Sequence, residues 1–346
     1  MRKKRSSFKR AALKFLCTLL GIILVLMLSI TVYFQHLLGQ INYIDPDDTP
    51  TLSQEELDIL LQEESEDSDS TAPVMDPDDV QFQDHSTQIG GKGSDLVNIL
   101  LIGQDRREGE SRARSDTMIL ATFNKDTKQL TLTSFLRDLY VEIPGYQDNR
   151  INVAYAAGGM SLLNETLEHN FGIHVDGNVE VDFNQFAQIV DLLGGVTMEL
   201  RQDEANVINR DTGSSLSAGT QRLSGAQALS YARIRSLDAD GDFSRTNRQR
   251  NVINALLASY KDSSLTAILS LLDEVLPMVT TDISNAKIIS YATELFPMLS
   301  GAQIVSQRIP ADGTYEGRMI RGMSVLVADM EATRQILAES LLGSAG

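Results

Sequence analysis

The chain has 346 residues, with 30 Lys+Arg against 47 Asp+Glu, a formal net charge of −17 and a single cysteine. A chain this acidic, with no basic stripe and no helix-turn-helix signature, is not expected to bind nucleic acid. One cysteine excludes a disulfide scaffold, and the length allows an ordinary hydrophobic core.

The N-terminus predicts a membrane anchor. Residues 1–14 carry seven basic and no acidic side chains, and Phe15–Phe34 then runs for twenty residues without a charge. Such a run can cross the roughly 30 Å hydrocarbon core of a bilayer, and no small-x-small cleavage site follows it. Because basic residues stay on the cytoplasmic side, we expect a cytoplasmic tail over 1–14, a transmembrane signal anchor over 15–36, and the rest of the chain outside.

An acidic segment follows the predicted anchor. Ile44–Asp84 contains fifteen acidic side chains and no basic one, so its charges repel one another and it buries little apolar surface. We interpret residues 37–93 as an extended, solvated extracellular stem, with a short helix at Ser53–Gln62. The stem carries most of the net negative charge, which leaves residues 94–343 as one nearly neutral extracellular domain.

This domain alternates short apolar runs with longer amphipathic segments. Runs that are β-branched and bounded by turn residues predict strands at Val97–Ile102, Thr117–Phe123, Leu130–Phe135, Asn178–Phe183, Val196–Leu200 and Ile304–Ile309. Helical periodicity predicts helices at Ile151–Asn170, Asn184–Leu193, Gly225–Ala232, Ser244–Tyr260, Ser284–Leu299 and Val325–Leu342. The alternation is typical of an α/β fold, in which helices flank a central mixed sheet in a three-layer sandwich.

Four polar clusters lie at the ends of predicted strands or the starts of helices. They are GQDRR at Gly103–Arg107, RSDT at Arg114–Thr117, the pair Arg137-Asp138, and YARIRSLDADGDFSRTNRQRN at Tyr231–Asn251. In open α/β sheets, ligands collect at the carboxyl ends of the strands, which suits the first and third clusters. The alternative for each cluster is a turn cap or a set of solvated charges that stabilise the protein little.

The fourth cluster begins with two arginines that are two residues apart. On a helix Arg233 and Arg235 would diverge, whereas on an extended segment they would point the same way. The helix that begins at Gly225 should therefore end near Ala232 and present both guanidinium groups from an extended exit.

The rest of the cluster predicts one functional helical face. Asp242, Arg245 and Gln249 share that face through their i, i+3, i+7 spacing, and Arg250 lies off it, so we expect Arg250 to be solvated. Guanidinium groups bind phosphate oxygens bidentately, and carboxylates among them pair with arginine or hold a hard cation such as Mg²⁺. A pyrophosphate site is the simplest interpretation of such a mixture.

The clusters resemble the motifs of the LytR-CpsA-Psr family of cell-envelope proteins. The likeness rests on NILLIGQDRREGESRARSDTMIL, SFLRDLYVEIPGY, NRINVAYAAGG and YARIRSLDADGDFSRTNRQR, which occur in the family's order and span roughly Asp95 to Leu342. A short basic tail followed by one anchor is also the family's usual layout. Two positions depart from its pattern: Leu136 stands where the family usually has proline, and Arg150 where it often has lysine.

The resemblance implies a Mg²⁺-dependent phosphotransferase in a Gram-positive type envelope. Such an enzyme moves a teichoic-acid-like or capsular glycopolymer from a polyprenyl pyrophosphate carrier in the membrane lipid to a sugar hydroxyl of peptidoglycan, as a phosphodiester. By motif, the expected Mg²⁺ ligands are Asp105 and Asp116, and the expected pyrophosphate-binding residues are Arg107, Arg114, Arg137, Arg233, Arg235, Asp242, Arg245 and Gln249. The expected catalytic residues are Asp105, Arg137, Asp138, Arg233, Arg235 and Arg245, with Asp105 and Asp138 as alternative acceptors of the hydroxyl proton.

Two other functions fit the same residues. A non-catalytic envelope sensor would bind lipid-linked precursors without forming a product, and a polyprenyl pyrophosphate phosphatase would need no acceptor sugar. The predicted helices at Ile151–Asn170, Asn184–Leu193 and Gly225–Ala232 also have two interpretations. These helices either line a slot for the polyprenyl chain or belong to the ordinary hydrophobic core.

Overall fold

The computed structural model describes residues 39, 41–45, 51–62, 71–82, 88–104, 115–238, 242–260, 263–264, 267, 270–271, 274–299 and 301–342. The expected anchor at Phe15–Phe34 and the segment Asp105–Arg114 lie outside these residues. Within the described part of the chain, no helix is long and apolar enough to cross a membrane.

A seven-stranded mixed sheet forms the centre of the molecule, in the order β1-β10-β7-β2-β3-β4-β11. Its strands are β1 (Asn42–Tyr43), β10 (Thr280–Thr281), β7 (Gly177–Asp182), β2 (Leu96–Gln104), β3 (Ser115–Asn124), β4 (Gln129–Phe135) and β11 (Gln303–Ile309). The strands β2, β3 and β4 form an antiparallel meander, whereas β7 pairs with β2 and β11 pairs with β4 in parallel. The carboxyl ends of β2, β4, β7 and β11 therefore share one edge with the amino end of β3.

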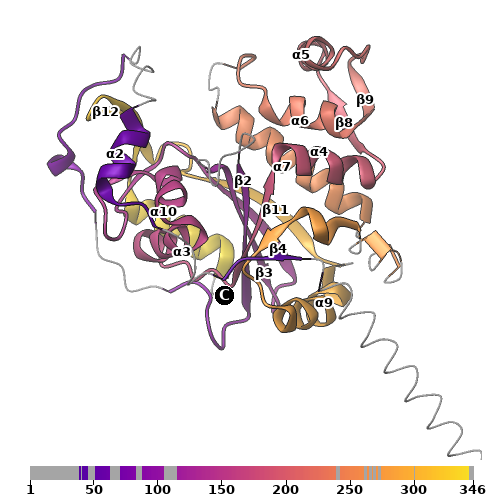
Figure 1. The fold of residues 1–346 in the computed structure, drawn as a ribbon, viewed down its shortest axis with the longest axis horizontal. Helices are drawn as coiled ribbons and strands as arrows, with labels where there is room; N and C mark the ends of the chain where they lie inside the picture. Colours follow the sequence, from indigo (N-terminus) through magenta and orange to yellow (C-terminus); the bar gives the residue numbers. More distant parts are fainter. Residues whose placement is uncertain are drawn as a thin grey trace, which may run out of the picture.

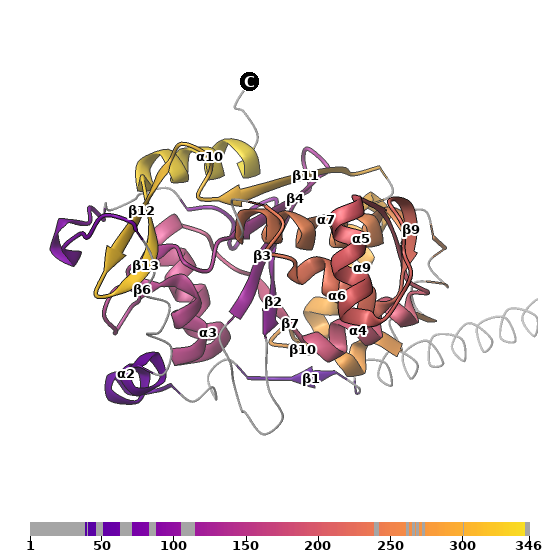
Figure 2. The ribbon, with the colours of Figure 1, turned by 90° about the horizontal axis from the view of Figure 1, so that it is seen from above.

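Helices cover both faces of this sheet (Figures 1 and 2). On one face, α3 (Ile151–Phe171) and α10 (Met330–Leu342) enclose the main core with alternate strand residues such as Leu100 and Leu120. On the other, α7 (Asp242–Tyr260) and α9 (Asn285–Leu299) pack over Ile119 and Leu132. The predicted α/β sandwich with a central mixed sheet is confirmed.

A helical lobe follows β7 and builds its own core. It contains α4 (Phe183–Leu192), the antiparallel pair β8 (Val196–Leu200) and β9 (Gly219–Leu223), α5 (Gln202–Thr212) and α6 (Gly225–Arg233). Val252 of α7 joins the buried side chains of this lobe, so α7 packs against both the lobe and the sheet. The sequence had not predicted α5 or β9.

The last predicted helix, Val325–Leu342, is wrong over its first five residues. Met323–Ala328 forms the strand β13, paired with β12 (Tyr315–Ile320), and the helix begins only at Met330. Arg321 and Gly322 both take positive φ values, 51° and 78°, and form the tight turn between the two strands. A tight turn of this kind favours a hairpin over a continuous helix.

The hairpin also packs against the small pair β5 (Tyr140–Val141) and β6 (Asn149–Arg150). Tyr140, Ile320 and Val325 form a cluster that is completed by side chains from residues 71–82. Two short 3-10 helices, at Pro77–Asp79 and Leu276–Met278, complete the described elements.

The acidic segment is not a solvated linker where the structure describes it. The strand β1 extends the central sheet, and the helix α2 (Gln54–Gln62), expected at Ser53–Gln62, buries Leu57 in the main core with only 1% of its surface exposed. At a kink of α3, where Gly159 has φ of 64°, the Ala157 carbonyl accepts a hydrogen bond of 2.8 Å from the backbone N–H of Leu52. The apolar residues spaced along the segment outweigh its charge, because the domain offers them a surface to bury.

Candidate functional site

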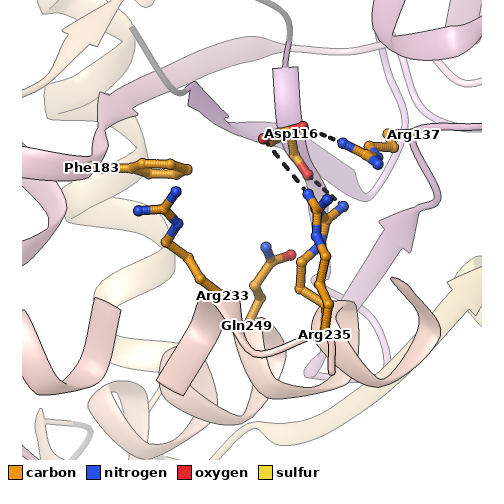
Figure 3. Close-up of a pocket in the computed structure, with 7 residues that line it drawn as sticks. Asp116, Arg137, Phe183, Arg233, Arg235 and Gln249 are labelled. Carbon is orange, nitrogen blue, oxygen red and sulfur yellow. Dashed lines mark hydrogen bonds and ion pairs between the residues drawn. The ribbon is translucent and has the colours of Figure 1, made fainter. Parts of the chain in front are cut away.

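A polar pocket of about 380 Å³ lies where the strand ends meet the lobe (Figure 3). Asp116 of β3 and Arg137, which follows β4, line it from the sheet. The lobe and α7 contribute the remaining lining residues, which are Phe183, Arg233, Arg235, Arg245 and Gln249. Six of these seven residues were predicted as site residues, and the fold brings them together from segments far apart in the sequence.

Arg137 is held by carboxylates on several sides. Its Nη1 lies 3.0 Å from Asp116 Oδ1, and its Nε lies 2.9 Å from Asp242 Oδ2 and 3.5 Å from Asp138 Oδ2. Burial alone would lower the pKa of Arg137, but these three carboxylates raise it above its usual value. Arg137 is therefore a fixed, permanently charged member of the pocket wall.

Asp242 plays the complementary role among the cations. Its carboxylate lies 2.9 Å from Arg137, 3.2 Å from Arg245 Nη2 and 3.4 Å from Arg235 Nε. The sequence predicted that Asp242 would share one helical face with Arg245 and Gln249. In the structure it contacts three guanidinium groups and reduces their mutual repulsion.

Arg233 and Arg235 reach the pocket from the end of α6. This helix ends at Arg233, and the next residue, Ile234, has φ of −59° and ψ of 123°, which is the extended exit that the spacing predicted. The guanidinium of Arg233 lies over the Phe183 ring at 4.6 Å, a cation–π distance, whereas Arg235 extends towards Asp116 (Figure 3). The two arginines thus face one pocket from different walls, with Gln249 between them.

Arg245 and Gln249 carry buried polar atoms that no described group satisfies. Arg245 is almost fully buried, and its Nη2 donates to the Asp116 carbonyl at 3.4 Å, but its Nε has no partner among the described residues. The Oε1 atom of Gln249 is also buried without a hydrogen-bond partner among the described residues. Unsatisfied buried polar groups are costly, so their presence in a pocket wall indicates a polar ligand.

Asp138 lies behind the pocket wall. Besides Arg137, its carboxylate approaches Arg150 Nε at 3.6 Å, and Arg150 also donates to the Ser324 carbonyl at 3.0 Å. Arg150 thus keeps the charge expected at this position. The backbone N–H of Leu136 donates to the Ile309 carbonyl at 2.9 Å, a hydrogen bond that the family's usual proline lacks the N–H to make.

Three predicted site residues, Asp105, Arg107 and Arg114, lie outside the described residues. The described part of the chain contains no group of three His, Cys, Asp or Glu side chains that could hold a metal ion. Asp116 is the one predicted metal ligand that is placed. Its Oδ1 accepts from Arg137, and its Oδ2 is 4.0 Å from Arg235, which is too long for a hydrogen bond.

Arg250 corrects an expectation, since it is buried with 4% of its surface exposed. The helix α7 packs on β4 and β11, and Asn254, one turn further along, donates to Ser306 Oγ of β11 at 3.0 Å. The face of α7 opposite the pocket is therefore covered by the sheet rather than by solvent. The i, i+3, i+7 pattern identifies one functional face, but it cannot show what covers the others.

Two further contributors were missed. Phe183 follows β7 directly and had been read as the end of a strand. Arg248, also 4% exposed, lies 2.9 Å from Glu204 Oε1, donates to the Ile234 carbonyl at 3.2 Å and pairs with Asp238. It therefore fixes the turn that carries Arg235, and only the alternation of Arg and Asp in this stretch could have suggested such pairing.

The two faces of the sheet differ in how tightly they are covered. The helix α3 belongs to the main core of buried side chains, so plain core is the correct interpretation for it. Over the opposite face, many apolar side chains of the sheet and of α7 and α9 remain only partly buried, including Leu101, Ile253, Leu257, Leu295 and Met298.

Comparisons with known proteins agree with this geometry. The chain is 35% identical over 253 residues to the polyisoprenyl-teichoic acid--peptidoglycan teichoic acid transferase TagU of Oceanobacillus iheyensis, a match that covers 70% of this chain and 75% of that protein. It is 36% identical over 167 residues to the regulatory protein MsrR of Staphylococcus aureus, covering 48% of this chain and 49% of MsrR. The match to MsrR thus spans about half the length of that relative.

A solved structure and a family model point the same way. The LytR-CPS2A-psr family protein YwtF (TagT) with bound octaprenyl pyrophosphate lipid superimposes with a TM-score of 0.56 at 27% identity, covering 72% of this chain and 91% of that one. A sequence model described as the LytR_cpsA_psr family matches residues 59–340. Since this match takes in six of the seven strands of the sheet, the lobe and every residue of the pocket, the chain belongs to the LytR_cpsA_psr family.

Proposed function

We propose that the protein transfers a teichoic-acid-like or capsular glycopolymer from a polyprenyl pyrophosphate carrier to peptidoglycan. The observation that carries the proposal is the pocket, where Arg137, Arg233, Arg235 and Arg245 converge. Four guanidinium groups around one space of about 380 Å³ match the negatively charged, non-bridging oxygens of a pyrophosphate diester better than they match any neutral ligand.

The proposed reaction is a displacement at phosphorus. A sugar hydroxyl of peptidoglycan attacks the phosphorus nearer the glycan, the bond from that phosphorus to the bridging oxygen breaks, and polyprenyl phosphate leaves with the bond's electron pair. The arginines stabilise the charge that develops on the leaving oxygen and the equatorial oxygens. The hydroxyl proton goes to a carboxylate, either Asp105 or Asp138, and Asp138 is already held between Arg137 and Arg150.

The relatives support this assignment through their names. TagU is named as a teichoic acid transferase acting on peptidoglycan, and YwtF (TagT) was solved with octaprenyl pyrophosphate. For this chain we propose the same classes of donor and acceptor. The partly buried apolar layer between the sheet, α7 and α9 is the proposed place for the polyprenyl chain, because hydrocarbon binds where apolar surface is already shielded but not filled.

We also propose that the site uses Mg²⁺. Asp116 has a carboxylate oxygen in the pocket without a hydrogen bond from arginine, and Mg²⁺ typically takes one or two carboxylates together with phosphate oxygens. Asp116 and Asp105 would hold the ion. When bound, the ion neutralises charge on the phosphate oxygens. The arginines and Gln249 then have the separate task of orienting the pyrophosphate.

The proposed setting is the outer face of the cell membrane. Residues 1–14 and the uncharged run Phe15–Phe34 support a cytoplasmic tail and a single anchor, which would hold the domain beside its lipid-linked donor. Protease added to intact protoplasts should remove the domain and leave a small anchored fragment. Protection of the domain would reverse this topology.

Product analysis distinguishes the possible functions. The full chain in detergent is incubated with a synthetic lipid-linked glycan and peptidoglycan oligomers, with and without Mg²⁺, and the products are identified by mass spectrometry. A new phosphodiester between glycan and oligomer supports the transferase, and it should require Mg²⁺ in the parent but form poorly at any Mg²⁺ concentration with Asp116→Asn. Release of glycan phosphate without an acceptor would mean a phosphatase, and donor binding without any product would mean a sensor.

A further inference from the structure

A second set of arginine nitrogens is buried outside the pyrophosphate pocket, between α7 and the sheet. Arg250 of α7 donates from Nη2 to Asn247 Oδ1 at 2.8 Å, but its Nε and Nη1 are buried and have no partner among the described residues. The Nε of Arg308 on β11 and the Oγ of Ser134 on β4 are also buried without one. None of these three side chains lines the pyrophosphate pocket.

The strand register places these groups on one face. Ser134 is the Cα partner of Arg308 in the parallel pair β4–β11, and the next pair, Phe135 and Ile309, belongs to the main core on the α3 side. Because successive side chains alternate between faces, Ser134 and Arg308 point towards α7. The hydrogen bond from Asn254 to Ser306 brings the same stretch of α7 onto this part of β11.

Little negative charge is available there to balance two guanidinium groups. Arg308 pairs with Asp312, whose side chain is 85% exposed, and Arg308 also lies 4.6 Å from the centre of the Phe243 ring. No carboxylate is within ion-pair distance of Arg250 among the described residues. A buried cation without a counter-ion is strongly unfavourable, whereas an anion that joins it removes most of that penalty.

We propose that Arg250, Arg308 and Ser134 form a second oxyanion-binding site, separate from the pyrophosphate pocket. The arginines supply three unused donor nitrogens from two walls, and the serine hydroxyl adds a fourth donor group. Arg308, which is partly exposed, forms the outer part of the site, and Arg250 forms the inner part. The site does not depend on the transfer reaction, because it requires only that a polymer or free anion reach the outer end of β11.

The protonation of Arg250 is consistent with an anion-binding site. Burial, together with the positive charge of Arg308, lowers the pKa of Arg250 to about 10. Arg250 nevertheless remains charged at neutral pH, so it would attract an anion under physiological conditions.

Either a phosphate or a carboxylate offers the required oxygens. A phosphate group could come from the backbone of an anionic glycopolymer or from free phosphate, and a carboxylate could come from a peptide. The probes are therefore inorganic phosphate, glycerol 3-phosphate and acetate, each compared with chloride at the same ionic strength.

The test measures melting temperature in the full chain carrying Arg233→Gln and Arg235→Gln, which weakens the pyrophosphate pocket. Phosphate should raise the melting temperature by roughly 2–4 °C over chloride, because a ligand that binds only the folded state stabilises it. Adding Arg250→Met should abolish that rise and, in chloride, should itself raise the melting temperature by removing an unbalanced buried charge. Arg210→Met, at an exposed position on α5, is the matched control and should keep the phosphate response.

If Arg250→Met does not fold, Arg308→Met tests the same site. It too should lose the rise in melting temperature that phosphate causes. Equal responses in the background protein and in these variants would overturn the proposal and leave Arg250 as a structural residue. A response to phosphate and glycerol 3-phosphate but not to acetate would assign the site to a phosphate group, and a response to acetate alone would assign it to a carboxylate. No response to any probe in the background protein would also overturn it.

Discussion

Arg137 and Asp242 show how single residues set the charge of the pocket. Each is the shared counter-ion of several groups of opposite charge: Arg137 for three carboxylates and Asp242 for three guanidinium groups. The individual ion pairs of Arg137 and Asp242 add little stability, since both side chains are partly solvated. Their effect is to hold the arginines in place before a ligand binds. The entropy lost in ordering these side chains therefore does not weaken binding.

The residue-scale prediction concerns lysine substitutions. Arg233→Lys and Arg235→Lys should each weaken binding of a polyprenyl pyrophosphate analogue roughly ten- to a hundredfold, because lysine keeps the charge but loses the planar fork. For Arg233, lysine also loses the guanidinium plane that lies over Phe183. Affinity is measured by titration in proteins of equal thermal stability.

Arg210→Lys is the control for this series, since Arg210 is exposed on α5 and pairs only with the neighbouring Asp211 among the described residues. Arg250 is unsuitable as a control because it is buried. Affinities that are equal in all three variants would show that the pocket arginines act only as diffuse charge.

At the scale of elements, the turn between α6 and α7 depends on α5. Arg248 of α7 reaches Glu204 of α5 and the Ile234 carbonyl, so one buried guanidinium joins three helices. Arg201 at the start of α5 adds an ion pair of 3.2 Å to Asp238 in the same turn. The position of Arg235 is therefore decided by residues outside the pocket.

Breaking this clamp should be costly. Arg248→Met removes the guanidinium nearest to the buried carboxylate of Glu204 and leaves only Arg201 beside it, at 3.8 Å, so we expect a loss of about 3–5 kcal/mol in the free energy of unfolding. The double variant Glu204→Gln, Arg248→Met removes this poorly compensated charge and should recover most of that loss. Both are measured by denaturant unfolding, and a double variant no more stable than the single one would contradict the charge argument.

Helices and strands were predictable from the sequence where local pattern and tertiary setting agree. The edge that gathers β2, β3 and β4 follows from three apolar runs, each flanked by polar residues, and the end of α6 follows from the spacing of Arg233 and Arg235. The hairpin β12–β13 was missed because a short apolar run such as MSVLVA fits a helix as well as a strand. Whether such a run forms a strand or a helix depends on the segment with which it pairs, and that segment lies outside the run.

The site was predictable for a different reason. Arg137, Arg233 and Arg245 are charged residues at element ends, where burial has no local explanation, and the fold brings all three into one pocket. Arg248 and Arg250 have the same residue type on the same helix, yet they face α5 and the sheet. Only the packing of α7 on two neighbours distinguishes the arginines that line the pocket from those that pack against α5 and the sheet.

At the scale of the whole molecule, the acidic segment belongs to the folded body. Its described parts extend the central sheet through β1, bury Leu57 of α2 in the main core and cover Tyr140 with Phe82. The family match from residue 59 onward also begins inside this segment. Composition alone suggested a linker, since the fifteen acidic residues of this segment outnumber the few apolar side chains that make the contacts.

Removing one of these contacts should destabilise the entire domain. Leu57→Ala is expected to cost about 2–5 kcal/mol, as for other leucines that are truncated in a close-packed core. Glu55→Ala, at an exposed position of the same helix, should change stability by less than about 0.5 kcal/mol. Thermal and denaturant unfolding of the full chain measure both. If the two variants are equally stable, α2 is only loosely attached.

The pairing of β1 with β10 has a consequence for how far the domain can stand from the membrane. A free chain over residues 37–93 could stretch to about 200 Å, enough to carry a catalytic unit deep into a cell wall. Asn42 instead pairs with Thr280 at the edge of the sheet, and only seven residues separate it from Phe34, the last residue of the uncharged run. The eight Cα–Cα steps from Phe34 to Asn42 span about 30 Å at most. The domain would then stay within one protein diameter of the bilayer surface, so the lipid-linked donor need hardly leave the membrane and the acceptor strand of peptidoglycan must come down to meet it.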